Sequence, residues 1–199
     1  MRTLCHIGQL ILWLVGLSLI SAGCQFPGST KPVIKIGLIA PFEGEGRPFG
    51  YQRLYGVKLA LQEVNLAGGL AGYKFELVAL NDYGDGAETA LQARELVLDS
   101  DVKGVIGQWE PALQAAAAPI YAEAQLASVE PDHFAKFDDL PESFDAAYQT
   151  LAGSPAGPQA RQAYLATQHL LKAIETAGHQ SGTPERVNVL KALHILDQN

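Results

Sequence analysis

The apolar and polar positions between residues 33 and 131 alternate between two patterns. Residues 33–40 form an apolar run rich in β-branched side chains, which predicts a strand. The next segment, residues 51–67, carries apolar residues at steps of three and four, which places them on one stripe of a helix. That stripe consists of Leu54, Val57, Leu61 and Val64. A strand followed by an amphipathic helix, repeated along the chain, predicts a parallel sheet with helices packed on it.

Three more strands and two more helices continue the alternation. The sequence predicts strands at 73–82, 102–107 and 126–129, and helices at 87–100 and from residue 111 onward. Asp85 is suited to cap the first of these helices, and Pro111 stands in a first turn, where its missing N–H costs nothing. Ligands of such sheets lie beyond the carboxyl ends of the strands, so a site is expected in the loops that follow them.

The pattern changes after residue 131, because no further strand is evident. Three helices are predicted there, at 142–153, at 159–178 and from residue 184 to 197. We expect Gly178 to end the second helix and Thr183 to cap the third. These helices are expected to cover the first sheet. Residues 33–197 are therefore predicted to form a single Rossmann-like α/β lobe, with strand–helix repeats in 33–131 and returning helices in 132–197.

Residues 1–23 resemble an export signal and are set aside from the fold. The apolar run at 7–20 is short for a bilayer span, and the small residues 21–23 precede Cys24. This arrangement resembles the lipobox of bacterial lipoproteins, which implies that Cys24 is lipidated and that 24–32 is a tether. An ordinary signal peptide with a stray cysteine and an uncleaved N-terminal anchor are the alternatives.

Charge and cysteine content narrow the function classes. The chain carries 14 basic and 21 acidic residues, a net charge of −7, and removal of Arg2 with the signal leaves −8. An acidic domain has no electrostatic reason to bind nucleic acid or anionic lipid. Once Cys5 is removed with the signal, Cys24 is the one remaining cysteine, which excludes an internal disulfide and a cysteine-based metal or redox site.

The glycines 44, 46 and 50, between a strand and a helix, form a loose Gly-x-Gly-x-x-x-Gly pattern. A dinucleotide site also requires an acidic residue about 20 positions further on. Asp82 lies 38 residues after Gly44, which is too far, so a flexible loop at the mouth of a cleft is the simpler interpretation. We expect no cofactor.

Six carboxylates follow the predicted strands. They are Glu43, Glu45, Asp82, Asp85, Glu110 and Glu130. Such groups could do acid–base work or bind calcium, but no EF-hand spacing is present, and solvated loop charge is the simpler interpretation. The histidines show no metal-ligand spacing, and no Gly-x-Ser-x-Gly elbow or nucleophilic cysteine follows a strand. The sequence therefore predicts neither a metal site nor an enzyme.

Phe49 and Trp109 each follow a predicted strand, one in the first loop and one in the third. An aromatic residue at this place serves either as a plug of the core or as a wall for an apolar ligand. Spacing alone leaves both roles open.

Several of these segments resemble the N-terminal lobe of type I periplasmic binding proteins, in particular the leucine/isoleucine/valine-binding family of ABC transporters. The resemblance is carried by G-x-x-x-P at 37–41, G-x-x-L-A at 56–60, N-x-A-G-G-L-x-G at 65–72 and V-I-G at 105–107. Residues 144–193 resemble a segment near the family's C-terminus. Family members cross to a second lobe between these segments, so the resemblance implies one lobe of a two-lobed clamshell.

The resemblance also implies a function and a site. It implies a solute-binding component of an ABC importer for amino acids or similar small polar solutes. Phe49 and Trp109 would wall the ligand, with Glu110 and Glu130 as polar contacts. The family holds its ligand with small hydroxyl residues after the third strand, where this chain has residues 108–112 (QWEPA), so branched-chain specificity does not follow.

The expected partners are an ABC permease or a second binding-protein chain, with a membrane attachment through the N-terminal lipid, in the periplasm or at the cell surface. If an intact member binds with about −8 kcal/mol and one lobe keeps half, the affinity falls to about millimolar. A non-transporting extracytoplasmic scaffold lipoprotein that uses the former interlobe face, and a vestigial deletion product, are the alternatives.

Overall fold

The structure is a computed structural model that describes residues 31–134 and 136–198. Pro32–Asn199 is one compact unit. The predicted signal at 1–23, Cys24 and all but the last two residues of the predicted tether lie outside the described residues. Within the described ranges, no helix is both long and apolar enough to cross a membrane.

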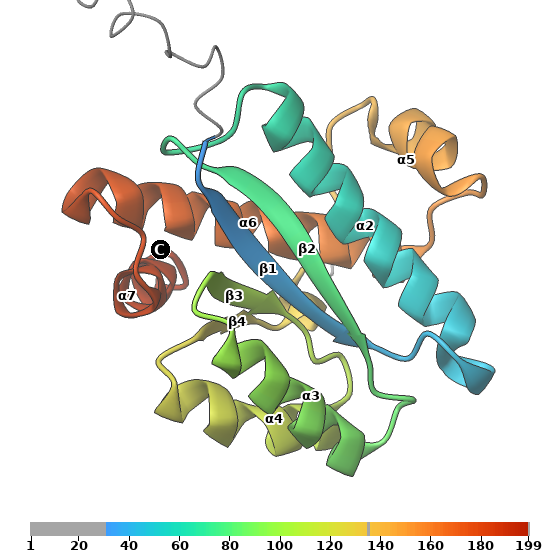
Figure 1. The fold of residues 1–199 in the computed structure, drawn as a ribbon. Helices are drawn as coiled ribbons and strands as arrows, with labels where there is room; N and C mark the ends of the chain where they lie inside the picture. The colour runs from blue at the N-terminus through green and yellow to red at the C-terminus, as the bar shows by residue number, and fades with distance from the viewer. Residues whose placement is uncertain (1–30, 135, 199) are drawn as a thin grey trace, which may run out of the picture. The chain divides into compact units, whose positions relative to one another are not determined.

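Four strands form one parallel sheet in the order β2-β1-β3-β4 (Figure 1). β1 (Val33–Ala40) pairs with β2 (Lys74–Asn81) along its whole length and with β3 (Val102–Ile106) on its other side. β3 in turn pairs with β4 (Ala127–Val129). This arrangement confirms the predicted α/β fold with a parallel sheet of about four strands.

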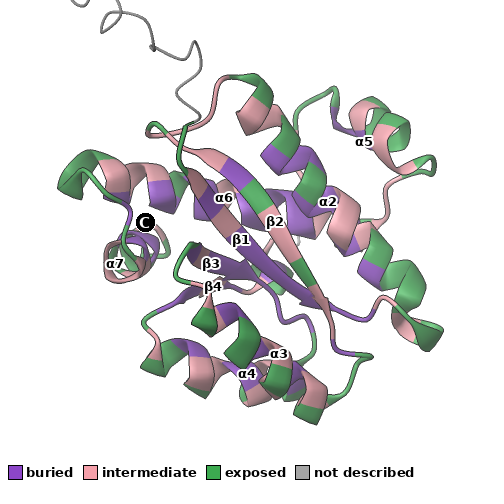
Figure 2. Ribbon diagram, viewed as in Figure 1, coloured by how far each residue is buried: buried purple, intermediate pink, exposed green. Residues whose placement is uncertain are grey.

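Helices cover both faces of the sheet, so the inner strands are buried on two sides (Figure 2). α3 (Gly86–Leu98) and α4 (Pro111–Glu123) pack on one face, in a cluster that includes Ile39 of β1. The neighbouring β1 residues Ile36 and Leu38 belong to the cluster on the other face. Side chains of a strand alternate between its two faces, which explains why β1 reads as a continuous apolar run.

α2 (Arg47–Leu66) begins four residues before its predicted start at Tyr51. A 3₁₀ turn, η1 (Gly44–Gly46), leads directly into it, and Pro48 stands in the first turn, where proline favours a helix. Phe49 therefore lies in the first helical turn and not in the loop where the sequence pattern placed it.

Of the three helices predicted after residue 131, the last two return to the sheet, whereas the first packs on α2 and on the helix that follows it. The expectation that all three cover the sheet is therefore wrong for the first. A 3₁₀ turn, η2 (Pro131–His133), leads to α5 (Phe144–Ala152), and α6 (Pro158–Ser181) and α7 (Arg186–Leu196) follow. The cluster of buried residues that contains β1 also contains side chains of α6 and α7. Members from α6 and α7 are Ala163, Ala166, Leu170, Leu171, Ala173, Ile174, Ala177, Val189, Ala192 and Leu193. The sheet and the last helices therefore share one apolar interior.

Two predicted helix ends in this region are wrong. α6 continues through Gly178 and ends at Ser181, with Gly182 in the left-handed conformation at φ +78°. A Cβ on Gly178 would lie 2.9 Å from Cβ of Ala71, so this glycine permits a close approach. The N-cap of α7 is Glu185 instead of Thr183.

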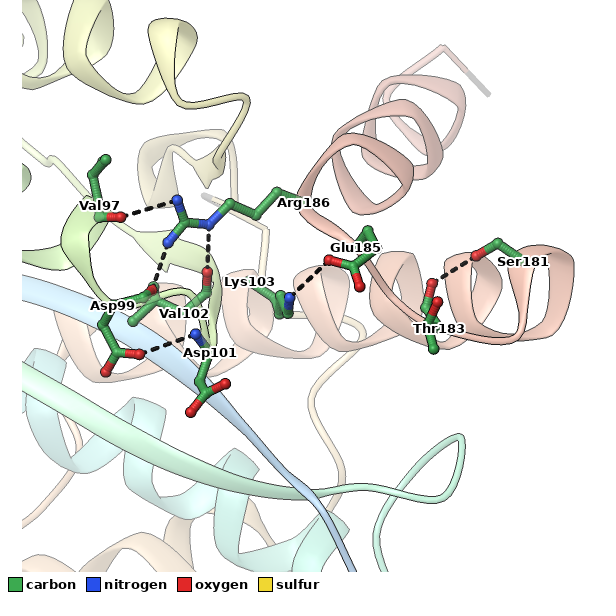
Figure 3. A network of polar contacts seen from close by, with 9 residues as sticks. All are labelled: Val97, Asp99, Asp101, Val102, Lys103, Ser181, Thr183, Glu185 and Arg186. Atoms are coloured by element: carbon green, nitrogen blue, oxygen red, sulfur yellow. Dashed lines mark hydrogen bonds and ion pairs between the residues drawn. The ribbon is translucent and has the colours of Figure 1, made fainter.

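Arg186 fastens the start of α7 to the strand–helix repeats (Figure 3). Its guanidinium donates to three backbone carbonyls between the end of α3 and the start of β3. The acceptors are the carbonyl oxygens of Val97, Asp99 and Val102. Next to it, Lys103 Nζ lies 3.1 Å from Glu185 Oε2. The guanidinium thus satisfies carbonyl groups that a helix end and a turn leave without intrahelical partners.

We predict that Arg186→Gln lowers the free energy of unfolding by about 2 kcal/mol, because partly buried carbonyls lose charged donors. For a unit of this size the melting temperature should fall by about 4–8 °C. Arg94→Gln, on the exposed side of α3, is the matched control and should change the stability by less than about 0.5 kcal/mol. Equal melting of the two variants would show that apolar contacts alone hold α7.

Candidate functional site

The loops at the carboxyl ends of β1 and β2 are joined by one side chain. Asn81 Oδ1 accepts hydrogen bonds from the backbone N–H of Phe42 at 2.9 Å and of Tyr83 at 3.1 Å. The first lies in the loop after β1 and the second in the loop after β2. One amide oxygen therefore holds both loops in place at the carboxyl end of the sheet, where ligands of parallel sheets bind.

Arg53, Trp109 and Glu110 come together at this end of the sheet. The Arg53 guanidinium carbon lies 4.3 Å from the centroid of the Trp109 ring, a cation–π arrangement. Arg53 Nη2 also donates to Glu110 Oε1 at 3.0 Å. Arg53 is 5% exposed and Trp109 7% exposed, whereas the Glu110 side chain is half exposed. The arginine thus joins α2 to the loop after β3.

Asp82 adds a buried carboxyl group to this region. It is 1% exposed and accepts hydrogen bonds from Gly84 N at 3.0 Å and Thr89 Oγ1 at 3.1 Å. Burial raises the pKa of the Asp82 carboxyl, and the two hydrogen bonds oppose this shift. The charge of Glu110 raises the same pKa and that of Arg53 lowers it, so these three groups act on one another.

Several buried polar atoms beside this group have no hydrogen-bond partner among the described residues. They are Arg53 Nε, both side-chain amide atoms of Gln108, and Trp109 Nε1. Gln108 is 3% exposed. A buried donor or acceptor without a partner costs about 1–3 kcal/mol, so the loop after β3 carries polar atoms of a kind that native interiors usually satisfy.

Glu130 lies at the end of β4 and is connected to the same loop through Gln114. Gln114 Nε2 donates to Glu130 Oε1 at 2.8 Å, and Gln114 Oε1 accepts from the backbone N–H of Gln108 at 3.1 Å. His133 Nε2 lies 3.7 Å from the other oxygen of Glu130. No recorded contact of the described residues joins Glu130 directly to Arg53, Trp109 or Glu110.

Phe49 is 48% exposed and lies one helical turn before Arg53 on the same side of α2. Of the four residues predicted to bind a ligand, Trp109 and Glu110 both contact Arg53, Phe49 lies one helical turn before Arg53, and Glu130 lies at the end of a short polar chain. Their role in binding stays a prediction.

The sequence analysis missed Arg53 and gave no role to Gln114. A signal for Arg53 was present, because it falls between Gly50 and Val57 on the buried side of α2. A charged residue on an apolar stripe requires a partner. Within the described ranges, no group of histidine, cysteine or carboxylate side chains could hold a metal ion.

Comparisons with known proteins agree with this fold. A sequence model of the family described as "Periplasmic binding protein" matches residues 33–150. Leu/Ile/Val-binding protein homolog 1 of Brucella abortus is 30% identical over 112 residues, which are 56% of this chain and 30% of that protein. Homolog 2 of the same species is 33% identical over 104 residues, 52% of this chain and 28% of that protein. The chain therefore spans about a third of the length of these curated relatives.

Solved structures show the same architecture. LivJ of Streptococcus pneumoniae, a branched-chain amino acid transporter substrate-binding protein in complex with isoleucine, superposes with a TM-score of 0.70 at 13% identity. The alignment covers 81% of this chain and 87% of that one. The matched family consists of binding proteins and not of enzymes. Because its sequence model covers more than half of the residues, the chain belongs to the periplasmic binding protein family and has Leu/Ile/Val-binding proteins among its relatives.

Proposed function

We propose that this chain is a solute-binding component of an ABC-type importer for amino acids or similar small polar solutes. The observation that carries the proposal is the group of Arg53, Trp109 and Glu110 at the carboxyl end of the sheet, where ligands of parallel sheets bind. Polar groups of this kind fix the orientation of a ligand in a binding site. The relatives named above support the substrate class, since LivJ was solved with isoleucine.

In this proposal the ligand lies over the loop after β3. The exposed ring of Phe49 and the half-exposed carboxylate of Glu110 would contact it, while Arg53 holds Trp109 and Glu110 in place. Glu130 would contribute through Gln114 or by direct contact. The second oxygen of Glu110 has no recorded partner within residues 31–134 and 136–198, and it could accept a hydrogen bond from a ligand ammonium group.

The proposed partners are a permease and a polypeptide that supplies the opposite wall of the site. Binding sites for small molecules enclose 70–90% of their ligand, which one lobe alone does not do. A second wall closing by a hinge motion would restore the enclosure. Alone, this lobe should bind its solute with a dissociation constant of about 1 mM, which corresponds to half the binding free energy of a micromolar complex. The family is extracytoplasmic, and we propose attachment to the membrane through a lipid on Cys24.

We predict that millimolar isoleucine, or another amino acid or small amide in a panel, binds the purified chain. With Trp13→Phe, Trp109 is the only tryptophan, so its emission reports on the site directly. At ten times the dissociation constant the ligand should stabilise the fold by about 1.4 kcal/mol and raise the melting temperature. Unchanged emission and melting across the panel at millimolar ligand, with and without candidate partners, would refute the proposal.

We predict that Glu110→Gln weakens binding of that ligand about tenfold and changes the unfolding free energy by less than about 1 kcal/mol, because the Glu110 side chain is half exposed and glutamine keeps an oxygen that accepts from Arg53. Arg53→Gln should weaken ligand binding and also lower the free energy of unfolding by about 1–3 kcal/mol, because it leaves buried groups without their partner. Isothermal calorimetry and thermal melting separate the two effects. Glu45→Gln, an exposed acid in η1, is the control. If Glu110→Gln binds like wild type, Glu110 has no contact with the ligand.

A further inference from the structure

The two edges of the sheet differ. The outer strand β2 carries the charged residues Lys74 and Glu76, and charge on an edge strand discourages pairing with another chain. The other outer strand, β4, reads Ala-Ser-Val and carries no charge. Within the described ranges β4 pairs with β3 alone. Apart from its shortness, this edge therefore lacks the features that usually prevent pairing with a strand of another chain.

The free side of β4 presents the backbone N–H and C=O of one residue, Ser128. Val129 O accepts a hydrogen bond from Gly107 N at 3.0 Å, so the peptide groups of Val129 face β3. Successive residues of a strand direct their N–H and C=O groups to opposite sides. The N–H and the C=O of Ser128 therefore point away from the sheet, as a donor and an acceptor in the arrangement that a neighbouring strand requires.

A hollow of about 480 Å³ lies beside Ser128. Ser128, Val129 and Glu130 line one wall, and α6 and α7 supply His169, Leu193 and Asp197. An adjoining hollow of about 570 Å³ shares Phe134 and His169 with the first. The rings of these two residues lie 5.4 Å apart and separate the hollows. An added strand would direct alternate side chains toward these hollows.

We call the two adjoining hollows the groove, and the charges around it favour a basic occupant. Its lining includes four carboxylates and one lysine, together with the imidazoles of His133 and His169. The carboxylates belong to Glu130, Asp138, Asp139 and Asp197. His169 Nε2 lies 2.8 Å from Asp197 Oδ1, and the second oxygen of that carboxylate has no recorded contact in the described part of the chain. A second copy of this chain, with its net charge of −7, is poorly matched to such a surface.

We propose that the free edge of β4 binds an extended basic segment of another protein by strand addition. The backbone N–H and C=O of Ser128 would supply the hydrogen bonds of the strand pairing, and the carboxylates of the groove would select lysine or arginine side chains. Because β4 offers the backbone groups of one residue only, most of the discrimination comes from these side chains. This surface shares Glu130 with the proposed solute site, but Ser128 and Asp197, which the test variants change, have no part in that site. Failure of one proposal can therefore be told from failure of the other.

The probes are the peptide Ac-Thr-Lys-Val-Lys-Thr-NH₂, its counterpart with glutamate for lysine, and the basic peptide methylated on the valine nitrogen. We predict that the basic peptide shifts the amide resonance of Ser128 and binds the purified chain at least tenfold more tightly than the other two. Asp197→Asn, which keeps an acceptor for His169, should reduce the preference for lysine over glutamate at least threefold.

Ser128→Pro removes the outward N–H, which an edge strand tolerates because the ladder to β3 does not use it. It should weaken the basic peptide at least tenfold, whereas Ser128→Thr should bind like wild type. Equal binding of the basic and acidic peptides, or wild-type binding by a Ser128→Pro variant that melts like wild type, would overturn the proposal. A wild-type dimer that Ser128→Pro converts to a monomer would also overturn it, since a second copy would then fill the groove.

Discussion

The burial of one continuous apolar surface, shared by the inner strands and the last two helices, is the constraint on which the rest of the structure depends. The cluster that begins with Ile34 in β1 ends with Leu193 in α7, although about 160 residues of chain separate the two positions. β1 is enclosed on both faces, and its alternate side chains belong to different clusters. Removing α6 and α7 would expose the part of that face which α2 leaves uncovered, so the helices and the sheet stabilise each other.

The polar contacts at the two ends of the sheet differ. At the amino ends of the strands, the polar contacts of Arg186 satisfy carbonyl groups and hold α7 against the start of β3 (Figure 3). At the carboxyl ends, Arg53 makes one ion pair and one stacking contact, and several buried polar atoms remain without a partner. Native interiors rarely leave polar atoms unpaired, and those that do are commonly sites of function. The asymmetry supports placing the solute there.

The chemistry of that end departs from the hydroxyl-based ligand contacts that the family resemblance implies. In the proposed site, Arg53, Gln108 and Glu110 would instead recognise a solute by charge and amide groups. Arg53 is held both by the Trp109 ring and by the Glu110 carboxylate. The selectivity of the proposed site would then depend on the groups that Arg53 leaves free.

Periodicity was sufficient to predict the four strands, their parallel direction and most helix boundaries to within about two residues. Hydrophobic side chains at steps of two or of three and four report local geometry, which depends on residues close in sequence. Gly178 shows the limit of this reasoning. Glycine at a helix end and glycine at a close approach look alike in sequence, and Cβ of Ala71, from a distant loop, decides between them.

The sequence by itself thus determined the fold class, the family and the end of the sheet at which a site belongs. The tertiary structure alone decided which side chains meet there. Arg53 and Trp109 are 56 positions apart and touch because α2 and the loop after β3 converge beside the carboxyl end of β1. Likewise, only the strand order in the folded sheet shows that β4 is an edge strand. Local patterns encode which elements form, but contacts between distant residues arise from how those elements bury a common core, which no short stretch of chain specifies.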